Sequence, residues 1–201
     1  MKIAVLVSGR GSNLQALIAN FHGFDVEIVG VVSDNEDAPA LKHARTADIP
    51  TASFPEASYD GRESRDLAIA DWLDENQAEL VVLAGYMALL SDSFIARFRD
   101  RIINVHPSLL PAFPGTRAVE MAVAAGVKVF GVTVHLVDEG IDTGPILLQR
   151  AVELDGYSDP TEIHQILQKI EHELLPEGVR LMADGAVSRD PVNPQRLIIQ
   201  R

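Results

Sequence analysis

The sequence predicts an α/β fold in which an open, mostly parallel sheet is flanked by helices. Short apolar runs rich in β-branched residues alternate with helix-forming stretches along the first half of the chain. Runs such as AVLV and LVVLA are apolar at consecutive positions, as expected for central strands covered on both faces. After Gly115 two longer apolar runs follow each other without a crossover, so we expect a C-terminal antiparallel strand pair.

The expected elements follow one another along the chain. The first-half strands are predicted at Lys2–Val7, Val26–Val32, Glu79–Ala84 and Arg101–Val105. The helices between them are predicted at Ser12–Phe21, Ala38–Ala47, Arg62–Asn76 and Ser91–Phe98. A further helix is expected at Thr116–Ala125, followed by two strands within 127–138 and 145–154 that are joined by the turn-forming stretch EGIDTG.

A long final helix is expected over Asp159–Asp184, with Asp159 as its N-cap and Pro160 at its first position. Pro176 lies inside this stretch and should kink or divide the helix, because proline removes a backbone hydrogen bond. The tail SRDPVNPQRLIIQR is expected to be irregular or to form an edge strand. Since the sequence contains no repeat and no clear linker, we predict that residues 1–201 form a single domain with a Rossmann-like sheet.

Composition excludes several classes of function. The chain has no cysteine, which excludes disulfides, thiol nucleophiles and Cys-ligated metals. Its six histidines form neither HxxxH nor HExxH, so no metal site is predicted. The net charge of −12 opposes a broad surface for nucleic acid or an anionic membrane. No segment reaches about 18 apolar residues, so a cytoplasmic location is expected.

A glycine loop, VLVSGRGSNLQAL, follows the first predicted strand and opens the first predicted helix. Gly9 and Gly11 allow a tight turn, and the N–H groups at the start of the helix favour an anion. The loop lacks the third glycine of the dinucleotide fingerprint and the Gly-Lys-Ser/Thr of a Walker loop. Two interpretations stay open and are compatible: a phosphate cradle, and a simple turn capped by Ser12 or Asn13.

The stretch INVHPSLLPAFPGT, residues 103–116, combines polar groups with prolines. Alternation along the strand places Asn104 and His106 on the same side, at the carboxyl end where open α/β sheets bind ligands. The three prolines restrict the following loop, which would preorganise these groups toward developing charge. The alternative is a buried histidine satisfied by backbone, with prolines that only shape a turn.

The stretch DEGIDTGP offers three carboxylates, Asp138, Glu139 and Asp142. Asp142 stands between turn formers, where a loop can approach another strand end. From there its charge could orient His106 and favour the imidazolium. The alternative is an ordinary hairpin turn, because the sequence does not show that Asp142 reaches His106.

Four stretches taken together, SGRGSNLQAL, LAGYMALLS, NVHPSLLPAFPG and GVTVHLVDEGIDTGPILLQ, resemble the folate-dependent formyltransferases. The similarity runs from about Lys2 to Asp184, and its specificity comes from the order and spacing of the four pieces. It implies a nucleotide-binding half at 1–105 and a folate-binding and catalytic half at 106–201. The implied reaction moves a formyl group from 10-formyltetrahydrofolate to the glycine amine of glycinamide ribonucleotide, in purine biosynthesis and without a metal.

The resemblance also implies a catalytic trio and two binding sets. Asn104 and His106 would donate hydrogen bonds to an oxyanion, and Asp142 would favour the imidazolium and anchor a water that relays protons. The ribonucleotide phosphate and ribose would be bound by Gly11, Ser12, Asn13 and Glu171. The folate would be bound by Arg62, Met87, Ala88, Leu89, Leu90, Asn104, Asp138, Glu139, Gly140 and Ile141.

Without the resemblance, Glu171 is interpreted as a solvated charge on a helix and Arg62 as a surface charge at a helix start. The chain also departs from the family pattern. The family often carries Arg at Ala88, and many members carry His at Arg117 and Val119. His135 matches a family histidine, for which a structural role is the alternative.

Rival functions remain open at this point. A methionyl-tRNA formyltransferase-like enzyme would use similar chemistry, but such enzymes add a basic domain for tRNA. A formyltetrahydrofolate hydrolase would carry an extra N-terminal regulatory domain; we expect neither addition here. A non-catalytic phosphate- or nucleotide-binding module would leave Asn104, His106 and Asp142 unexplained. Small molecules are the expected partners, rather than nucleic acid or a membrane, and a homodimer stays an open expectation.

Overall fold

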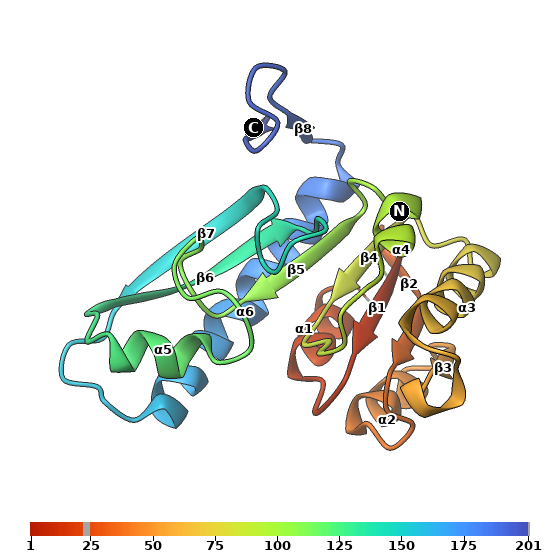
Figure 1. The fold of residues 1–201 in the computed structure, drawn as a ribbon, viewed down its shortest axis with the longest axis horizontal. Coiled ribbons are helices and arrows are strands. Elements are labelled where there is room, and N and C mark those ends of the chain that lie inside the picture. Colours follow the sequence, from red (N-terminus) through yellow and green to blue (C-terminus); the bar gives the residue numbers. More distant parts are fainter. Residues whose placement is uncertain (22–24, 201) are drawn as a thin grey trace. The chain divides into compact units, whose positions relative to one another are not determined.

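The computed structural model describes residues 1–21 and 25–200. These residues form two compact units, Met1–Ile103 and the chain from Asn104 onward. The strands described give a seven-stranded sheet in the order β3-β2-β1-β4-β5-β6-β7 and a separate β8-β9 pair (Figure 1). Three pairs, β1–β2, β1–β4 and β2–β3, are parallel, whereas β6–β7 is antiparallel. The predicted fold class is confirmed.

Within its described residues, 1–21 and 25–103, the first unit contains four complete strands and four α-helices. The strands are β1 (Lys2–Val7), β2 (Glu27–Ser33), β3 (Thr51–Ser53) and β4 (Leu80–Leu83). The helices are α1 (Ser12–Phe21), α2 (Pro39–Thr46), α3 (Arg62–Glu75) and α4 (Asp92–Arg97), with a 3₁₀ turn η1 (Glu56–Ser58). Strand β5 (Ile102–His106) begins at the end of this unit.

The second unit contains the long strands and the final helix. Its elements after β5 are α5 (Ala118–Ala124), β6 (Val129–Leu136), β7 (Ile146–Glu153), α6 (Pro160–Ala183), β8 (Val187–Arg189) and β9 (Leu197–Ile199). Helix α6 packs against β6 and β7. It begins as predicted, because the carboxylate of Asp159 accepts a hydrogen bond from the N–H of Thr161 at 2.9 Å.

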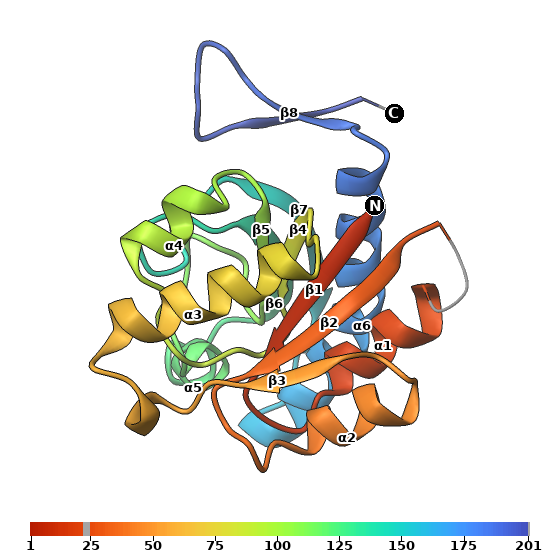
Figure 2. The same ribbon diagram turned by 90° about the vertical axis from the view of Figure 1, so that its right-hand side faces the viewer.

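Strand β1 is the centre of the first unit's core. Its residues from Ile3 to Val7 are all 0% exposed, since helices cover both faces of the parallel strands. Figure 2 shows α1 and α2 on one side of these strands and α3 on the other. This follows from right-handed crossovers, because the chain moves outward from β1 to β3 and then returns past β1 to β4.

The structure corrects two sequence expectations and decides between the two alternatives of a third. Strand β3 was not predicted, because its three residues, TAS, form no apolar run and join β2 through backbone pairing. Pro176 does not divide the final helix, which continues for 24 residues, held by buried side chains such as Leu174 and Val179. Of the two alternatives for the tail, the structure favours the edge strand, since Val187–Arg189 pairs antiparallel with Leu197–Ile199 in a two-stranded sheet; Arg201, at the end of the tail, lies outside the described residues.

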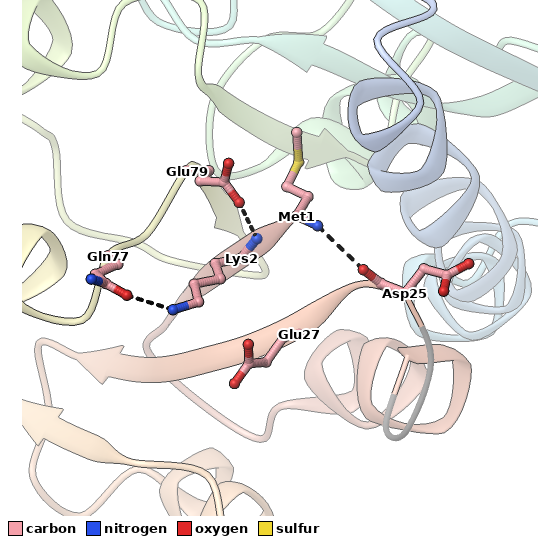
Figure 3. A pocket seen from close by; sticks show the side chains of 6 residues that line it. All are labelled: Met1, Lys2, Asp25, Glu27, Gln77 and Glu79. Carbon is pink, nitrogen blue, oxygen red and sulfur yellow. Dashed lines mark hydrogen bonds between the residues drawn. The ribbon is translucent and has the colours of Figure 1, made fainter.

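A shallow depression of about 640 Å³ opens where β1, β2 and β4 begin (Figure 3). Its polar groups bind one another: the Met1 amine donates to the Asp25 carbonyl at 3.2 Å, and the backbone N–H of Lys2 donates to Glu79 Oε2 at 2.6 Å. Parallel sheets bind ligands at the opposite, carboxyl ends of their strands. We therefore assign no site to this depression.

Neither a membrane span nor a metal cluster is found in the described part of the chain. No helix within residues 1–21 and 25–200 is long and apolar enough to cross a membrane. In the same residues, no group of three or more His, Cys, Asp or Glu side chains could hold a metal ion.

The packing of Trp72 against Gly30 gives a test of the first unit's core. A Cβ at position 30 would overlap the indole ring, so Gly30→Ala should destabilise the protein by about 1–3 kcal/mol in urea unfolding. In a Trp72→Leu background the same change should cost less than about 0.5 kcal/mol, because the colliding ring is gone. Equal costs in both backgrounds would contradict this packing.

Candidate active site

Three polar side chains converge at the carboxyl end of β5. The carboxylate of Asp142, in the loop between β6 and β7, lies 3.4 Å from His106 Nδ1 through Oδ2. Its other oxygen, Oδ1, accepts a hydrogen bond from Asn104 Nδ2 at 3.4 Å. All three residues belong to the second unit, and the two on β5 are separated by one residue, as strand alternation requires. Residues far apart in sequence are thus brought to one carboxylate.

The Asp142 carboxylate is held in its ionised form. Burial alone would raise its pKa, but hydrogen bonding by His135 and by the Gly115 N–H, together with the charge of His106, lowers it to about 2. The Gly115 N–H donates to Oδ2 at 2.7 Å. The side chain is only 13% exposed, so these interactions replace most of its hydration.

His106 is only 5% exposed, and its ring lies between two acceptors. Its Nε2 lies 2.9 Å from the carbonyl oxygen of Phe113, which can only accept, so Nε2 carries a proton. Its Nδ1 faces the carboxylate of Asp142. Only the imidazolium can donate to both neighbours. The alternative of a buried histidine bound only by backbone therefore holds for Nε2, which faces the Phe113 carbonyl. It does not hold for Nδ1, which faces the carboxylate of Asp142.

The proline-rich loop after β5 is fixed by hydrogen bonds from its own unit. Thr133, which is fully buried on β6, donates from Oγ1 to the Ser108 carbonyl at 2.6 Å and accepts from the Leu110 N–H at 3.1 Å. Ser108 Oγ donates to the carbonyl of Ala112 at 2.6 Å. The Phe113 carbonyl that meets His106 is thus part of a restrained loop.

His135 also lies at this candidate site, although the strand pattern did not indicate it. It is 2% exposed on β6, and its Nε2 lies 3.2 Å from Asn104 Nδ2 and 3.5 Å from Asp142 Oδ1. Its Nδ1 lies 2.8 Å from the carbonyl of Leu136. The alternation of residues along the strand did not predict these contacts. Only the family resemblance singled out His135.

The loop that carries Asp142 closes on itself. Asp138 Oδ1 accepts from the Gly140 N–H at 3.2 Å and from Thr143 Oγ1 at 2.6 Å. A Cβ at Gly144 would collide with the carbonyl oxygen of Leu136, so only glycine allows this close approach. Ile141, in the same loop, remains 56% exposed.

The glycine loop lies in the first unit, between β1 and α1. Gly11 has a φ of 80°, and a Cβ there would lie 2.6 Å from Ala40 Cβ, so glycine is required. The Gly9 carbonyl accepts from the Ala40 N–H at 3.1 Å, which ties the loop to α2. Ser12 is the first residue of α1, and Asn13 is 8% exposed. The loop is a packed turn at a helix start, a geometry that suits an anion.

The second predicted binding stretch of the first unit, Met87–Leu90, follows β4. Ser8 ties it to the glycine loop: its N–H donates to the Gly85 carbonyl at 3.2 Å, and its Oγ accepts from the Met87 N–H at 2.7 Å. Met87 and Leu89 are 60% and 57% exposed. Arg62 is exposed at the first position of α3.

Glu171 lies on α6, in the second unit, and is 5% exposed. The interpretation of this residue as a solvated helix-face charge is therefore wrong. A buried carboxylate needs a specific reason, since removing it from water is costly.

Comparisons with known proteins show the family to which this chain belongs. A family described as Formyl transferase matches residues 1–179. The chain is 41% identical over 181 residues to phosphoribosylglycinamide formyltransferase of Bacillus subtilis, covering 89% of this chain and 93% of that protein. It is 40% identical to the trifunctional purine biosynthetic protein adenosine-3 of Drosophila pseudoobscura pseudoobscura over 94% of this chain, but over only 14% of that longer protein.

Solved structures give the same result. The crystal structure of glycinamide ribonucleotide transformylase 1 from Symbiobacterium toebii superposes with a TM-score of 0.95 at 39% identity, covering 100% of this chain and 94% of that one. The fold and the matched sequence place the protein among enzymes of the α/β class that transfer one-carbon groups. More particularly, the chain belongs to the formyl transferase family.

The lowered pKa of Asp142 predicts how stability depends on pH. Because the folded pKa of about 2 lies below the ordinary 3.8, the carboxylate stabilises the fold above pH 4, and this contribution disappears as pH falls toward 2. Between pH 5 and pH 3, the free energy of unfolding should fall by about 1 kcal/mol more in the wild type than in Asp142→Asn. Parallel pH profiles for the two proteins, from denaturant unfolding, would show that the carboxylate is not held as described.

Proposed function

We propose that this protein transfers the formyl group of 10-formyltetrahydrofolate to the glycine amine of glycinamide ribonucleotide, a step of purine biosynthesis. The observation that carries the proposal is the single carboxylate of Asp142, which binds both Asn104 and His106 at a strand end. The relative from Bacillus subtilis, named for this activity, matches over nearly its whole length and supports the choice of substrates. A cytoplasmic location fits small-molecule substrates of this kind.

The proposed reaction balances without a metal or a redox partner. A bond forms between the glycine nitrogen and the formyl carbon, and the bond from that carbon to the folate nitrogen breaks. One proton leaves the attacking amine and one reaches the departing nitrogen. Negative charge develops on the formyl oxygen in between, so the site must supply donors and a proton path.

The trio supplies these functions in the proposal. The Asn104 amide and the protonated His106 ring would donate to the developing oxyanion, and Asp142 would stabilise the imidazolium. The Phe113 carbonyl and the oxyanion would compete for the Nε2 proton of His106, because that proton points to Phe113 in this structure. An acceptor that has gained a negative charge is the stronger of the two.

The remaining residues are assigned to binding. Gly11, Ser12 and Asn13 would hold the ribonucleotide phosphate at the start of α1, where helix N–H groups favour an anion. Glu171 would accept hydrogen bonds from the ribose hydroxyls. The folate would lie against Arg62, Met87, Ala88, Leu89, Leu90, Asn104, Asp138, Glu139, Gly140 and Ile141. Main-chain contacts at Ala88 would make the arginine of other family members dispensable.

Transfer of the formyl group to water is the one rival reaction that a specific observation supports. A formyltetrahydrofolate deformylase from Pseudomonas syringae pv. tomato superposes with a TM-score of 0.91 at 25% identity, although this chain covers only 66% of that one. Product analysis separates the two: formate released without glycinamide ribonucleotide supports the hydrolase, whereas formylglycinamide ribonucleotide supports the transferase.

The trio gives a direct prediction for turnover. His106→Ala and Asp142→Ala should each lower kcat by about 10²-fold or more, since each removes part of the oxyanion and proton-transfer machinery. Turnover is followed by absorbance as tetrahydrofolate product forms, and circular dichroism checks that the variants fold. Val119→Ala, on α5 and outside the trio, serves as a control that should keep kcat within about threefold. Near-wild-type rates for either trio variant would refute the mechanism.

Asn13 gives a separate prediction for substrate binding. Asn13→Ala should raise KM for glycinamide ribonucleotide by about tenfold, because a hydrogen bond to a charged phosphate is lost. KM for 10-formyltetrahydrofolate should stay within about twofold. Equal increases for both substrates would argue against a place for Asn13 at the phosphate.

A further inference from the structure

Arg65 and Asp66 on α3 form a buried ion pair that the proposed reaction does not use. Arg65 donates from Nε and Nη2 to Asp66 Oδ1, at 2.9 and 2.7 Å. The two side chains are 2% and 0% exposed. Burial would lower the pKa of Arg65, but hydrogen bonding to Asp66 and nearby negative charge raise it, so the guanidinium stays charged.

Both members of the pair also bind the backbone of the segment that follows β4. Arg65 Nη2 donates to the carbonyl of Leu89 at 2.9 Å. The other carboxylate oxygen of Asp66, Oδ2, accepts from the N–H of Ser91 at 2.5 Å. In addition, Ser8 Oγ accepts a hydrogen bond from the N–H of Met87. Side chains thus bind the backbone of residues 87–91 at three points: the Met87 N–H, the Leu89 carbonyl and the Ser91 N–H.

Packing alone does not explain why an ion pair is buried at this position of α3. Desolvating two charges costs several kcal/mol each, and apolar side chains of similar size would pack α3 at least as well. Apolar side chains, however, cannot bind the carbonyl and the N–H of an irregular segment. The side chains of Met87 and Leu89 point outward, at 60% and 57% exposure, although the backbone that carries them is fixed. A rigid backbone with exposed apolar side chains at a strand end is suited to a flat, partly apolar ligand.

We propose that Arg65 and Asp66 are positioning residues for the folate substrate, which act by holding Met87–Leu90 in its binding conformation. The proposal rests on the proposed function, since that function places the folate at this segment. Holding the backbone before binding removes the cost of ordering it on binding. The pair should therefore affect folate affinity selectively, and ribonucleotide affinity and kcat little.

The double variant Arg65→Met/Asp66→Leu tests this, because it removes both charges together and leaves no unpaired charge in the core. KM for 10-formyltetrahydrofolate should rise about 10- to 100-fold, as expected when charge-assisted anchors are lost. KM for glycinamide ribonucleotide and kcat should stay within about twofold. The matched control, Arg97→Met/Asp74→Leu, removes a solvent-exposed ion pair between α4 and the same helix α3, and should leave all three values unchanged.

Amide hydrogen exchange of residues 85–91 provides a readout that does not depend on turnover. Exchange there should become faster in Arg65→Met/Asp66→Leu and stay unchanged in the control. Arg65→Lys, which keeps the charge but not the planar fork, should give an intermediate effect and serves if the double variant does not fold. Unchanged exchange, or equal increases in both KM values, overturns the proposal. If the wild type formylates no ribonucleotide, the proposed function fails, while the exchange result still decides whether the pair fixes this segment.

Discussion

The ionised carboxylate of Asp142 is the interaction on which the candidate site depends. It is nearly buried, and it stays charged because the Gly115 N–H, His135, His106 and Asn104 surround it with donors and positive charge. A neutral acid at this position would offer His106 Nδ1 no charge to face. The negative charge of Asp142 therefore orients both the His106 imidazole and the Asn104 carboxamide. The loop that carries Asp142 is needed to place this charge.

Both units hold irregular backbone in place with hydrogen bonds from polar side chains, most of them buried. In the second unit, Thr133 binds the backbone at Ser108 and Leu110 and so restrains the loop whose Phe113 carbonyl meets His106. In the first unit, Ser8, Arg65 and Asp66 do the same for the segment after β4. Loops at the carboxyl ends of parallel strands carry ligands in this class of fold, and a loop that is already ordered loses less entropy on binding.

Much of the fold could be predicted from the sequence because central strands and their covering helices carry strong periodic signals. Strand β1 and helix α1 match their predicted bounds, and the cap at Asp159 was identified from its residue type alone. Strand β3 was missed because backbone pairing with β2 defines it, and its side chains carry no pattern. The continuity of α6 through Pro176 was missed because burial along the helix outweighs one lost hydrogen bond.

Side chains of the site were predictable only where strand ends or the family resemblance pointed to them. Strand alternation placed Asn104 and His106 on one side, but the approach of Asp142 from another loop was not visible in the sequence. Arg65 and Asp66 have the composition of a solvated helix face, and their burial depends on a segment more than twenty residues away. Long-range contacts of this kind leave no local signal.

Nitrogen-15 NMR of the His106 ring tests most directly whether Asp142 controls the imidazole. If it does, both ring nitrogens carry protons in the ligand-free wild type, and the Nδ1 proton is lost in Asp142→Asn while the Nε2 proton facing Phe113 remains. An unprotonated Nδ1 in the wild type, together with an unchanged ring spectrum in Asp142→Asn, would contradict control of the imidazole by Asp142.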